Sequence, residues 1–251
     1  MDVVIETFDA GIYTITLNRP DKKNAMDTSL LQGLYNALKR ADEQAPQIII
    51  IRGSGKAFCA GGDLVEFNES SDPGDRIDDM ADRLHQSIML IRNTGAIVIA
   101  VVEGVAVGAG LGLSLACDLT LAAKNAIMNL GYRRIGLTPD GGGSISLPRL
   151  IGAKRFNELY LLSANVNMTE ALALGLVNFV CDEDEIDVKL AEIVKNLLIL
   201  PMETITRFKS LVNNSMFSGL GDHLDMEQQY VKELGSQPLF KERLAAFFRK
   251  R

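Results

Sequence analysis

The stretch from Ala96 to Ala123 constrains the fold more than any other part of the chain. It is almost wholly apolar, but Glu103 and Asp118 interrupt it, and glycines recur between Gly104 and Gly112. A membrane-spanning helix needs roughly 20 consecutive apolar residues, and the uncharged segments here are shorter and too rich in glycine. The stretch is therefore predicted to form a buried strand, a turn and a helix, followed by a second strand, and not a membrane segment.

The rest of the N-terminal half also alternates between strand and helix patterns. Residues 48–52 form a continuous apolar run, which is typical of a strand covered on both faces. Apolar periodicity predicts, in order, strands at 3–6 and 12–17, a helix at 28–42, a strand at 48–52, a helix at 80–92, a strand at 97–102, a helix at 108–116 and a strand at 118–122. The polar, acidic stretch 66–79 is expected to be mobile. This order predicts an α/β fold with mostly parallel strand pairing.

The chain becomes helical and amphipathic from Ala153 onward. Candidate helices cover residues 192–200, 201–212, 223–234 and 241–249. The change in character near residue 195 indicates a core over residues 1–195 and a helical appendage over residues 196–251. We expect this appendage to serve oligomerisation and not to be an independent domain.

Composition excludes several classes of function. The net charge is -6, so no overall electrostatic attraction to nucleic acid or to an anionic membrane is expected, and an anionic ligand would need a local basic patch. The three cysteines, Cys59, Cys117 and Cys181, form no CxxC pair, and only two histidines accompany them. No metal site is expected from that inventory. An odd number of cysteines without a signal peptide indicates a reducing cytoplasm.

Two glycine-rich loops are candidates for ligand binding. Gly108 to Gly112 is close to a dinucleotide-binding GxGxxG, but the spacing is wrong, and Gly53 to Ala57 lacks essential parts of a P-loop. Both loops follow a buried strand and end where a helix could begin. Helix N-termini present unpaired N–H groups, and two that face one point would form an oxyanion hole. The alternative is that these glycines only permit tight turns and close packing.

Several motifs, in order, resemble those of the crotonase superfamily, which contains the enoyl-CoA hydratases and isomerases. The segment AFCAGGDL (57–64) resembles the AF-x-AG-x-D-(L/I) signature, and VIAVVEGVAVGAGLGLSLACD (98–118) resembles the second signature. LNRP (17–20) with NAM (24–26) is similar to the N-terminal signature. Residues 136–147 and ALALGLV (171–177) match in the same order. The resemblance covers nearly the whole chain.

The resemblance implies a spiral of ββα units with a helical C-terminal region that packs in a homotrimer or a dimer of trimers. It implies an acyl-CoA thioester as substrate, with coenzyme A being part of that substrate and no separate cofactor. The oxyanion N–H donors would be Gly62 and Ala109. The expected coenzyme A-binding positions are Arg19, Lys22, Ala25, Lys56 and Ala60. The expected acyl-pocket positions are Leu64, Tyr132 and Leu137.

The sequence departs from the hydratases at the two positions that carry glutamates in that group. By register these positions are Gly112 and Tyr132. Glycine carries no proton, and an ordinary tyrosine, with a pKa of about 10, is a poor base at neutral pH. Hydration by two glutamates is therefore not expected.

One carboxylate remains at a position with precedent in the family. Asp140 lies in the segment GLTPDGG (136–142), where some isomerases and dehalogenating members carry an aspartate. A single carboxylate suffices for a 1,3-proton shift, so the leading interpretation is an enoyl-CoA double-bond isomerase with Asp140 as acid and base. The alternatives are an enoyl-CoA hydratase, a non-catalytic acyl-CoA-binding homologue, another crotonase reaction, or Asp140 as a simple turn residue.

Overall fold

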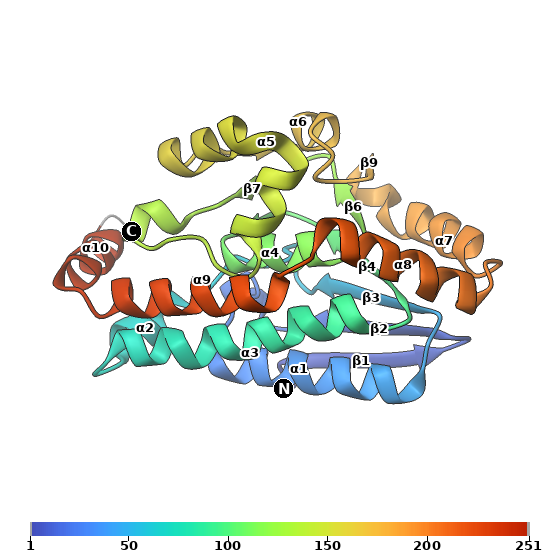
Figure 1. Cartoon of the computed structure of the whole chain (residues 1–251), viewed down its shortest axis with the longest axis horizontal. Coiled ribbons are helices and arrows are strands. Elements are labelled where there is room, and N and C mark those ends of the chain that lie inside the picture. Colours follow the sequence, from blue (N-terminus) through green and yellow to red (C-terminus); the bar gives the residue numbers. More distant parts are fainter. Residues whose placement is uncertain (1, 250–251) are drawn as a thin grey trace.

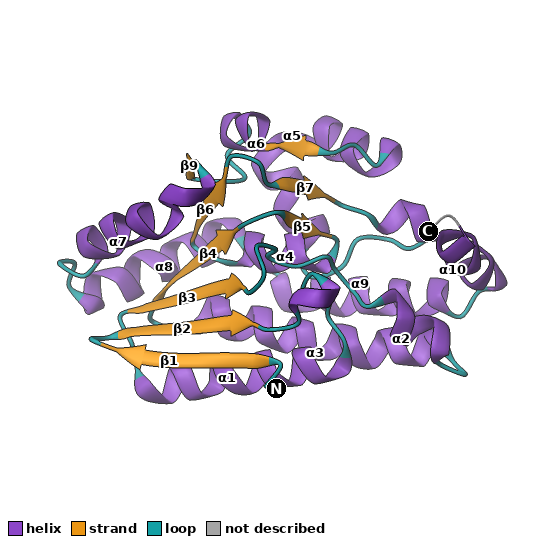
Figure 2. Cartoon of the chain, turned by 180° about the vertical axis from the view of Figure 1, so that it is seen from behind, coloured by secondary structure: helices purple, strands orange, loops and turns teal. Residues whose placement is uncertain are grey.

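The computed structural model describes residues 2–249 and shows a six-stranded sheet at its centre. The strands lie in the order β1 (Val4–Asp9), β2 (Ile12–Leu17), β3 (Ile48–Gly53), β4 (Ile97–Val102), β6 (Leu119–Ala123) and β9 (Phe179–Cys181). Only the first pair is antiparallel. The predicted α/β class with mostly parallel pairing is thus confirmed (Figures 1 and 2).

A second, smaller sheet contains β5 (Val105–Val107), β7 (Ile127–Asn129) and β8 (Val166–Asn167). The strand that follows β4 in the chain is β5, and the strand that follows β6 is β7. Each successive turn of the chain therefore gives one strand to the large sheet and one to the small sheet (Figure 2). After β3, Cys59 forms an isolated parallel bridge with Ala106 of β5. This arrangement agrees with the expected spiral of ββα units.

Alternate residues of β3 and β4 pack in two different hydrophobic clusters, because successive side chains point to opposite faces of a sheet. Ile49 and Val98 belong to the larger cluster, which contains the buried faces of α1 (Thr28–Gln44) and α3 (Pro73–Asn93). Ile50 and Ile99 belong to the cluster beneath α7 (Ile186–Leu197). Coverage of both faces explains why these strands read as unbroken apolar runs.

The acidic stretch 66–79, expected to be mobile, is mostly helical. It contains most of α2 (Leu64–Glu69) and the first two turns of α3. Asp72 caps α3 by accepting hydrogen bonds from the amides of Gly74 and Asp75, and Pro73 occupies the first helical turn. These start signals, together with burial of Ile77, outweigh the polar composition that suggested a loop.

The C-terminal part contains α8 (Met202–Met216), α9 (Leu220–Gly235) and α10 (Pro238–Arg249). In Figure 1, α9 lies along α3, and residues of the two helices contact each other. Within residues 2–249, no helix combines the length and the apolar character needed to cross a membrane.

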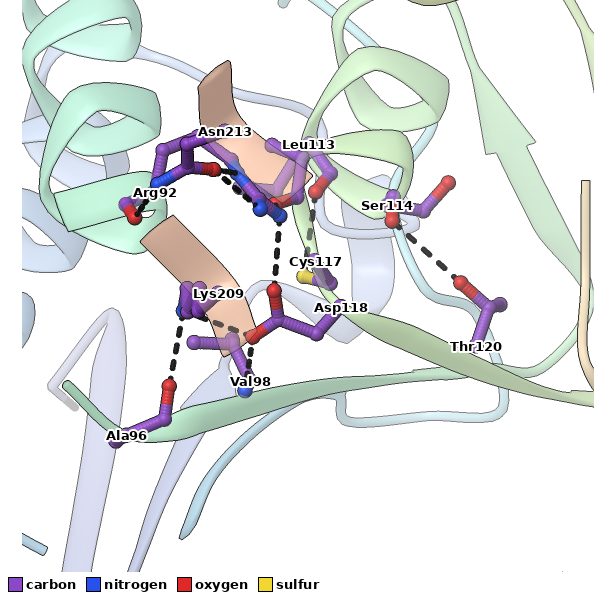
Figure 3. Close-up of polar contacts among 11 residues, drawn as sticks. Arg92, Ala96, Val98, Leu113, Ser114, Cys117, Asp118, Thr120, Lys209 and Asn213 are labelled. Atoms are coloured by element: carbon purple, nitrogen blue, oxygen red, sulfur yellow. Dashed lines mark hydrogen bonds and ion pairs between the residues drawn. The ribbon is translucent and has the colours of Figure 1, made fainter. Parts of the chain in front are cut away.

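Helix α8 is attached to the core through a buried ionic cluster (Figure 3). Asp118 forms ion pairs with Arg92 at 2.9 Å and with Lys209 at 2.8 Å. It also accepts a hydrogen bond from the amide of Val98, and Asn213 of α8 accepts from the Arg92 guanidinium. Every charge in this cluster therefore has a partner.

The remaining elements include the helices α4, α5 and α6 and several 3₁₀ turns. Helix α4 (Ala109–Ala116) follows β5, and the 3₁₀ turn η2 (Tyr132–Ile135) follows β7. Helix α5 (Gly143–Leu162) comes next and is interrupted at Gly152, where the backbone is not helical. Helix α6 (Met168–Ala173) and the 3₁₀ turns η1 (Pro20–Lys22) and η3 (Glu183–Glu185) complete the chain.

Candidate active site

The two amides expected to form an oxyanion hole lie at the ends of neighbouring strands. Cys59 pairs with β5, since its amide donates to Val105 and its carbonyl accepts from Val107. Three residues after Cys59 the chain reaches Gly62, and two residues after Val107 it reaches Ala109. A Cβ placed on Gly61 would lie 3.8 Å from the Ala109 amide nitrogen, so the two loops are in contact at this point.

Both amides are free to bind an oxygen. Ala109 is the first residue of α4, where backbone N–H groups have no partner within the helix. Its predecessor, Gly108, has φ of 55°, a conformation that favours glycine. Neither the Gly62 amide nor the Ala109 amide donates a hydrogen bond to any residue that the structure describes.

Asp140 lies on a turn that packs against the first residue of α4. It is 9% exposed, and the next residue, Gly141, packs against Ala109: a Cβ on Gly141 would lie 3.8 Å from the Ala109 Cα. The hydroxyl of Tyr132, at the start of η2, donates a hydrogen bond to the Asp140 carboxylate. The Tyr132 ring in turn lies against Gly108. Asp140, Tyr132 and the two backbone amides are therefore brought into one region.

Burial sets the acidity of this carboxyl group. Desolvation raises the pKa of Asp140 from 3.8 to about 6, and the hydrogen bond from Tyr132 opposes this rise. No lysine or arginine among residues 2–249 forms an ion pair with Asp140. Burial and the neighbouring carboxylate raise the pKa of Tyr132 well above its usual value, so that it remains a hydrogen-bond donor. A carboxyl with a pKa near neutral is suited to both take and return a proton.

The structure explains why no carboxylate occupies position 112. A Cβ on Gly112 would lie 2.5 Å from the Gly141 carbonyl oxygen, closer than van der Waals contact permits. The turn that carries Asp140 thus fills the space into which a residue 112 side chain would project. A glutamate at this position is incompatible with the present position of the turn.

Two of the predicted acyl-pocket residues lie close in the chain to Gly62 and to Asp140. Leu137 is buried, and its amide donates to the Tyr132 carbonyl at 3.1 Å. Leu64 is the first residue of α2, two positions after Gly62 in the chain. Tyr132, the third predicted pocket residue, contacts Asp140 directly, as described above.

The predicted coenzyme A-binding residues lie in two loops that contact each other. The amide of Ala60 donates to the Lys23 carbonyl, and the Ala25 carbonyl accepts from the Arg19 guanidinium. Arg19 also pairs with Asp63 at 2.9 Å and with Asp27 at 3.0 Å.

Two of the expected cations are therefore already paired with carboxylates. Besides Arg19, Lys56 pairs with Glu183 at 3.0 Å. Lys22, by contrast, is exposed in η1. The local surface is thus less positively charged than the sequence suggested, because neighbouring carboxylates offset the charges of Arg19 and Lys56.

Sequence reasoning missed Glu227, a buried carboxylate on α9 that reaches the Asp140 turn. Glu227 occupies the apolar face of its helix, in the row formed by Leu220, Leu224 and Val231. A glutamate in an otherwise apolar row was the signal that could have found it.

Comparison with known proteins shows the family of the chain. The chain is 28% identical to 1,2-epoxyphenylacetyl-CoA isomerase of Escherichia coli, over all of this chain and 97% of that protein. It is 30% identical to the enoyl-CoA isomerase/hydratase fer4 of Mycosarcoma maydis, covering 96% and 91% of the two chains. The crystal structure of an enoyl-CoA hydratase from Mycobacterium avium subsp. paratuberculosis superposes with a TM-score of 0.90 at 28% identity, over 98% of each chain. Residues 7–251 match the enoyl-CoA hydratase/isomerase family, and the chain therefore belongs to this family of the crotonase superfamily.

Proposed function

We propose that the protein is an enoyl-CoA isomerase that shifts a carbon–carbon double bond of an acyl-CoA thioester, with Asp140 as the proton carrier. The observation that carries this proposal is the buried Asp140 carboxylate, with no cationic partner among residues 2–249, on a turn that packs against Ala109. The relatives' names include both isomerase and hydratase at 28–30% identity. The choice of isomerisation therefore rests on the site.

The proposed reaction needs one base and one oxyanion hole. The Asp140 carboxylate removes a proton from C2 of a 3-enoyl thioester, and the electron pair of that C–H bond delocalises onto the thioester oxygen. The amides of Gly62 and Ala109 donate hydrogen bonds to that oxygen; removing one such donor typically costs about 2.7–4 kcal/mol. Asp140 then returns the proton to C4, and the double bond moves into conjugation with the carbonyl.

The site is less suited to hydration. Addition of water requires one group to activate the water and another to protonate the carbon. Position 112 has no room for a side chain, and position 132 carries a tyrosine whose pKa is raised well above its usual value. The same Asp140 would have to serve both steps.

Replacing Asp140 with Asn tests the assignment. We expect isomerisation of a 3-enoyl-CoA to fall by about 10²–10⁴-fold, with binding of the product thioester nearly unchanged, because Asn keeps the shape but loses the base. Undiminished turnover in D140N would remove Asp140 from the mechanism.

The wild-type protein also distinguishes the alternatives. Hydration of crotonyl-CoA without isomerisation would indicate a hydratase, and ligand binding without α-proton exchange in D₂O would indicate a non-catalytic binding protein.

We also propose that the protein forms a homotrimer or a dimer of trimers through the region of α8. A cavity of about 590 Å³ is lined by α8 and by the end of α4, and Asp140 is not among its lining residues; Phe208 and Leu211 on α8 are 66% and 71% exposed. A second copy of the chain would cover these apolar side chains. Sedimentation equilibrium of the wild type and of Phe208→Glu tests this; a monomeric wild type would contradict it.

A further inference from the structure

The turn that carries Asp140 is tied to helix α9 by one buried side chain, Glu227. One oxygen of its carboxylate accepts from the Gly142 amide at 2.7 Å. The other oxygen accepts from the Ser144 amide at 2.9 Å and from the Ser144 hydroxyl at 2.5 Å. Glu227 is 3% exposed, so these three bonds account for a carboxylate that is almost completely removed from water.

These contacts make Glu227 the cap of helix α5. The residue before α5 is Gly142, which has φ of 74° and no side chain with which to cap. The first amides of a helix need an acceptor and favour a negative charge. Glu227 supplies both from a position 85 residues further along the chain. The start of α5, and the turn before it, therefore depend on α9 for their position.

The turn is also held from the side of α3. The Gly141 amide donates to Nε2 of His85 at 3.3 Å, and the Gly143 amide donates to the Asp140 carbonyl at 3.1 Å. Burial lowers the pKa of His85 to about 4, so the ring is neutral and Nε2 remains an acceptor at neutral pH. Side chains from α3 and α9 thus fix the residues immediately after Asp140.

The neighbouring Ser144 and His223 do not form a nucleophilic site with Glu227. In a catalytic triad the carboxylate bonds to the ring nitrogen that faces away from the serine. Here Ser144 Oγ lies 2.7 Å from His223 Nε2, and Glu227 bonds to the serine itself. The carboxylate approaches the same Nε2 at 3.8 Å. The group therefore holds a turn and does not activate a hydroxyl.

We propose that Glu227 is a positioning residue for the isomerase reaction, holding the Asp140 turn in place against Ala109 from the C-terminal helical region. This inference rests on the proposed function, because it gives Glu227 its effect only through Asp140. Displacement of a reacting group by about 1 Å can lower a rate by 10²-fold. The fixed turn would therefore contribute to the rate without Glu227 touching the substrate.

Asp140 also influences the acidity of Glu227. Burial is the main reason why the pKa of Glu227 is raised to about 7; its bonds to Ser144 and Gly142 oppose this, and the charge of Asp140 adds to it. Because Asp140 has the lower pKa of the two, it is already charged when Glu227 titrates, whereas Glu227 is mostly protonated when Asp140 titrates. The other titratable groups nearby are Tyr132, which donates to Asp140, His85, whose ring accepts from the Gly141 amide, and His223, whose pKa is lowered by burial and by Arg149.

Glu227→Gln tests the proposal in the full-length protein. A Gln amide has one acceptor oxygen, so one of the two backbone amides would face an NH₂ group and the turn would move. We expect kcat for a 3-enoyl-CoA to fall by about 10–100-fold with little change in KM. The acid limb of the kcat/KM profile should stay near pH 6, because Glu227, with a pKa of about 7, is mostly protonated where Asp140 titrates. A role limited to stability would leave the kcat of the folded enzyme unchanged.

Three further variants serve as controls. Ser144→Ala keeps the backbone bond to Glu227 and should change kcat by less than about 3-fold. Asp118→Asn destabilises the protein at a distant cluster and should leave kcat unchanged. If Glu227→Gln does not fold, Glu227→Asp retains the charge with a shorter reach. Its kcat should fall while the acid limb stays close to that of the wild type.

The outcomes separate this proposal from the proposed function. Wild-type kcat in Glu227→Gln, alongside an inactive D140N, would overturn the role of Glu227 and leave the isomerase assignment intact. If the wild type itself does not isomerise 3-enoyl-CoA, the proposed function fails. The Asp140 carboxyl is then titrated by ¹³C NMR in the wild type and in Glu227→Gln. If its pKa and its chemical shift are the same in both, Glu227 does not position Asp140, and that proposal fails as well.

Discussion

Two aspartates show how the same side chain serves different purposes in this protein. Asp118 lies between two cations, Arg92 and Lys209, and also accepts a backbone hydrogen bond (Figure 3). Asp140 is more deeply buried, yet its carboxylate has only the neutral hydroxyl of Tyr132 as a partner among the side chains that the structure describes. A compensated charge holds helices together, whereas an uncompensated one has a raised pKa and is available for proton transfer.

Removal of the compensated charge at Asp118 should have the largest effect on stability. Asp118→Asn leaves Arg92 and Lys209 buried without their anion, which typically costs about 3–5 kcal/mol. We expect the free energy of unfolding in urea to fall by that amount, because α8 loses its ionic attachment to the core. The kcat of the folded enzyme should remain at the wild-type value, since no hydrogen bond or ion pair among residues 2–249 joins this cluster to Asp140. A loss of kcat comparable to that of D140N would contradict the distinction.

Removing the uncompensated charge should have the opposite effect on stability. The pKa of Asp140 is 3.8 when solvated and about 6 in the folded protein, so the folded state binds the proton more tightly. The stabilisation that the protonated Asp140 carboxyl contributes to the folded state is present below about pH 4 and is lost as the pH rises to about 6. At pH 7, D140N should therefore be more stable than the wild type by on the order of 3 kcal/mol.

Thermal unfolding at several pH values measures this effect. The two proteins should have similar stability near pH 3 and diverge between about pH 4 and pH 6. A constant difference across this range would mean that Asp140 is solvated in the folded state.

A third variant moves the Asp140 turn without changing any charge. In Gly112→Ala the new Cβ would lie 2.5 Å from the Gly141 carbonyl oxygen, and such overpacking typically costs about 1–3 kcal/mol. We expect a lower melting temperature and a lower kcat. Gly221→Ala is the matched control, because no atom lies within 4 Å of a Cβ at that helical position. Equal behaviour of the two variants would show that the close approach at Gly112 is not required.

The sequence predicts much of this fold because the relevant signals are local. Strands 12–17 and 97–102 are found at the predicted residues, since alternating and continuous apolar patterns report which faces are covered. The first two turns of α3 were missed because their residues are acidic, although Asp72 and Pro73 are strong start signals. Composition misleads where a helix has a broad solvent-exposed face.

The candidate site also contains residues that local motifs predict and residues that only tertiary contacts bring together. Gly62, Ala109 and Asp140 lie within short motifs that can be recognised in the sequence. Glu227 could not be placed, because its partners are 83 and 85 residues away. Likewise, the ion pairs of Arg19 with Asp27 and Asp63 depend on how two loops meet. Contacts of this kind follow from the tertiary fold and not from local spacing.

Tyr132→Phe has the smallest expected effect and tests the partner of Asp140 most directly. Loss of the hydroxyl should cost about 0.5–1.5 kcal/mol of stability. A hydrogen bond to the ionised form lowers the pKa of a carboxyl, so its removal should raise the pKa of Asp140 above about 6. The acid limb of kcat/KM should then move to higher pH, whereas Glu227→Gln should leave it in place. If the limb does not move, the titrating group that controls the reaction is not the carboxyl that Tyr132 contacts.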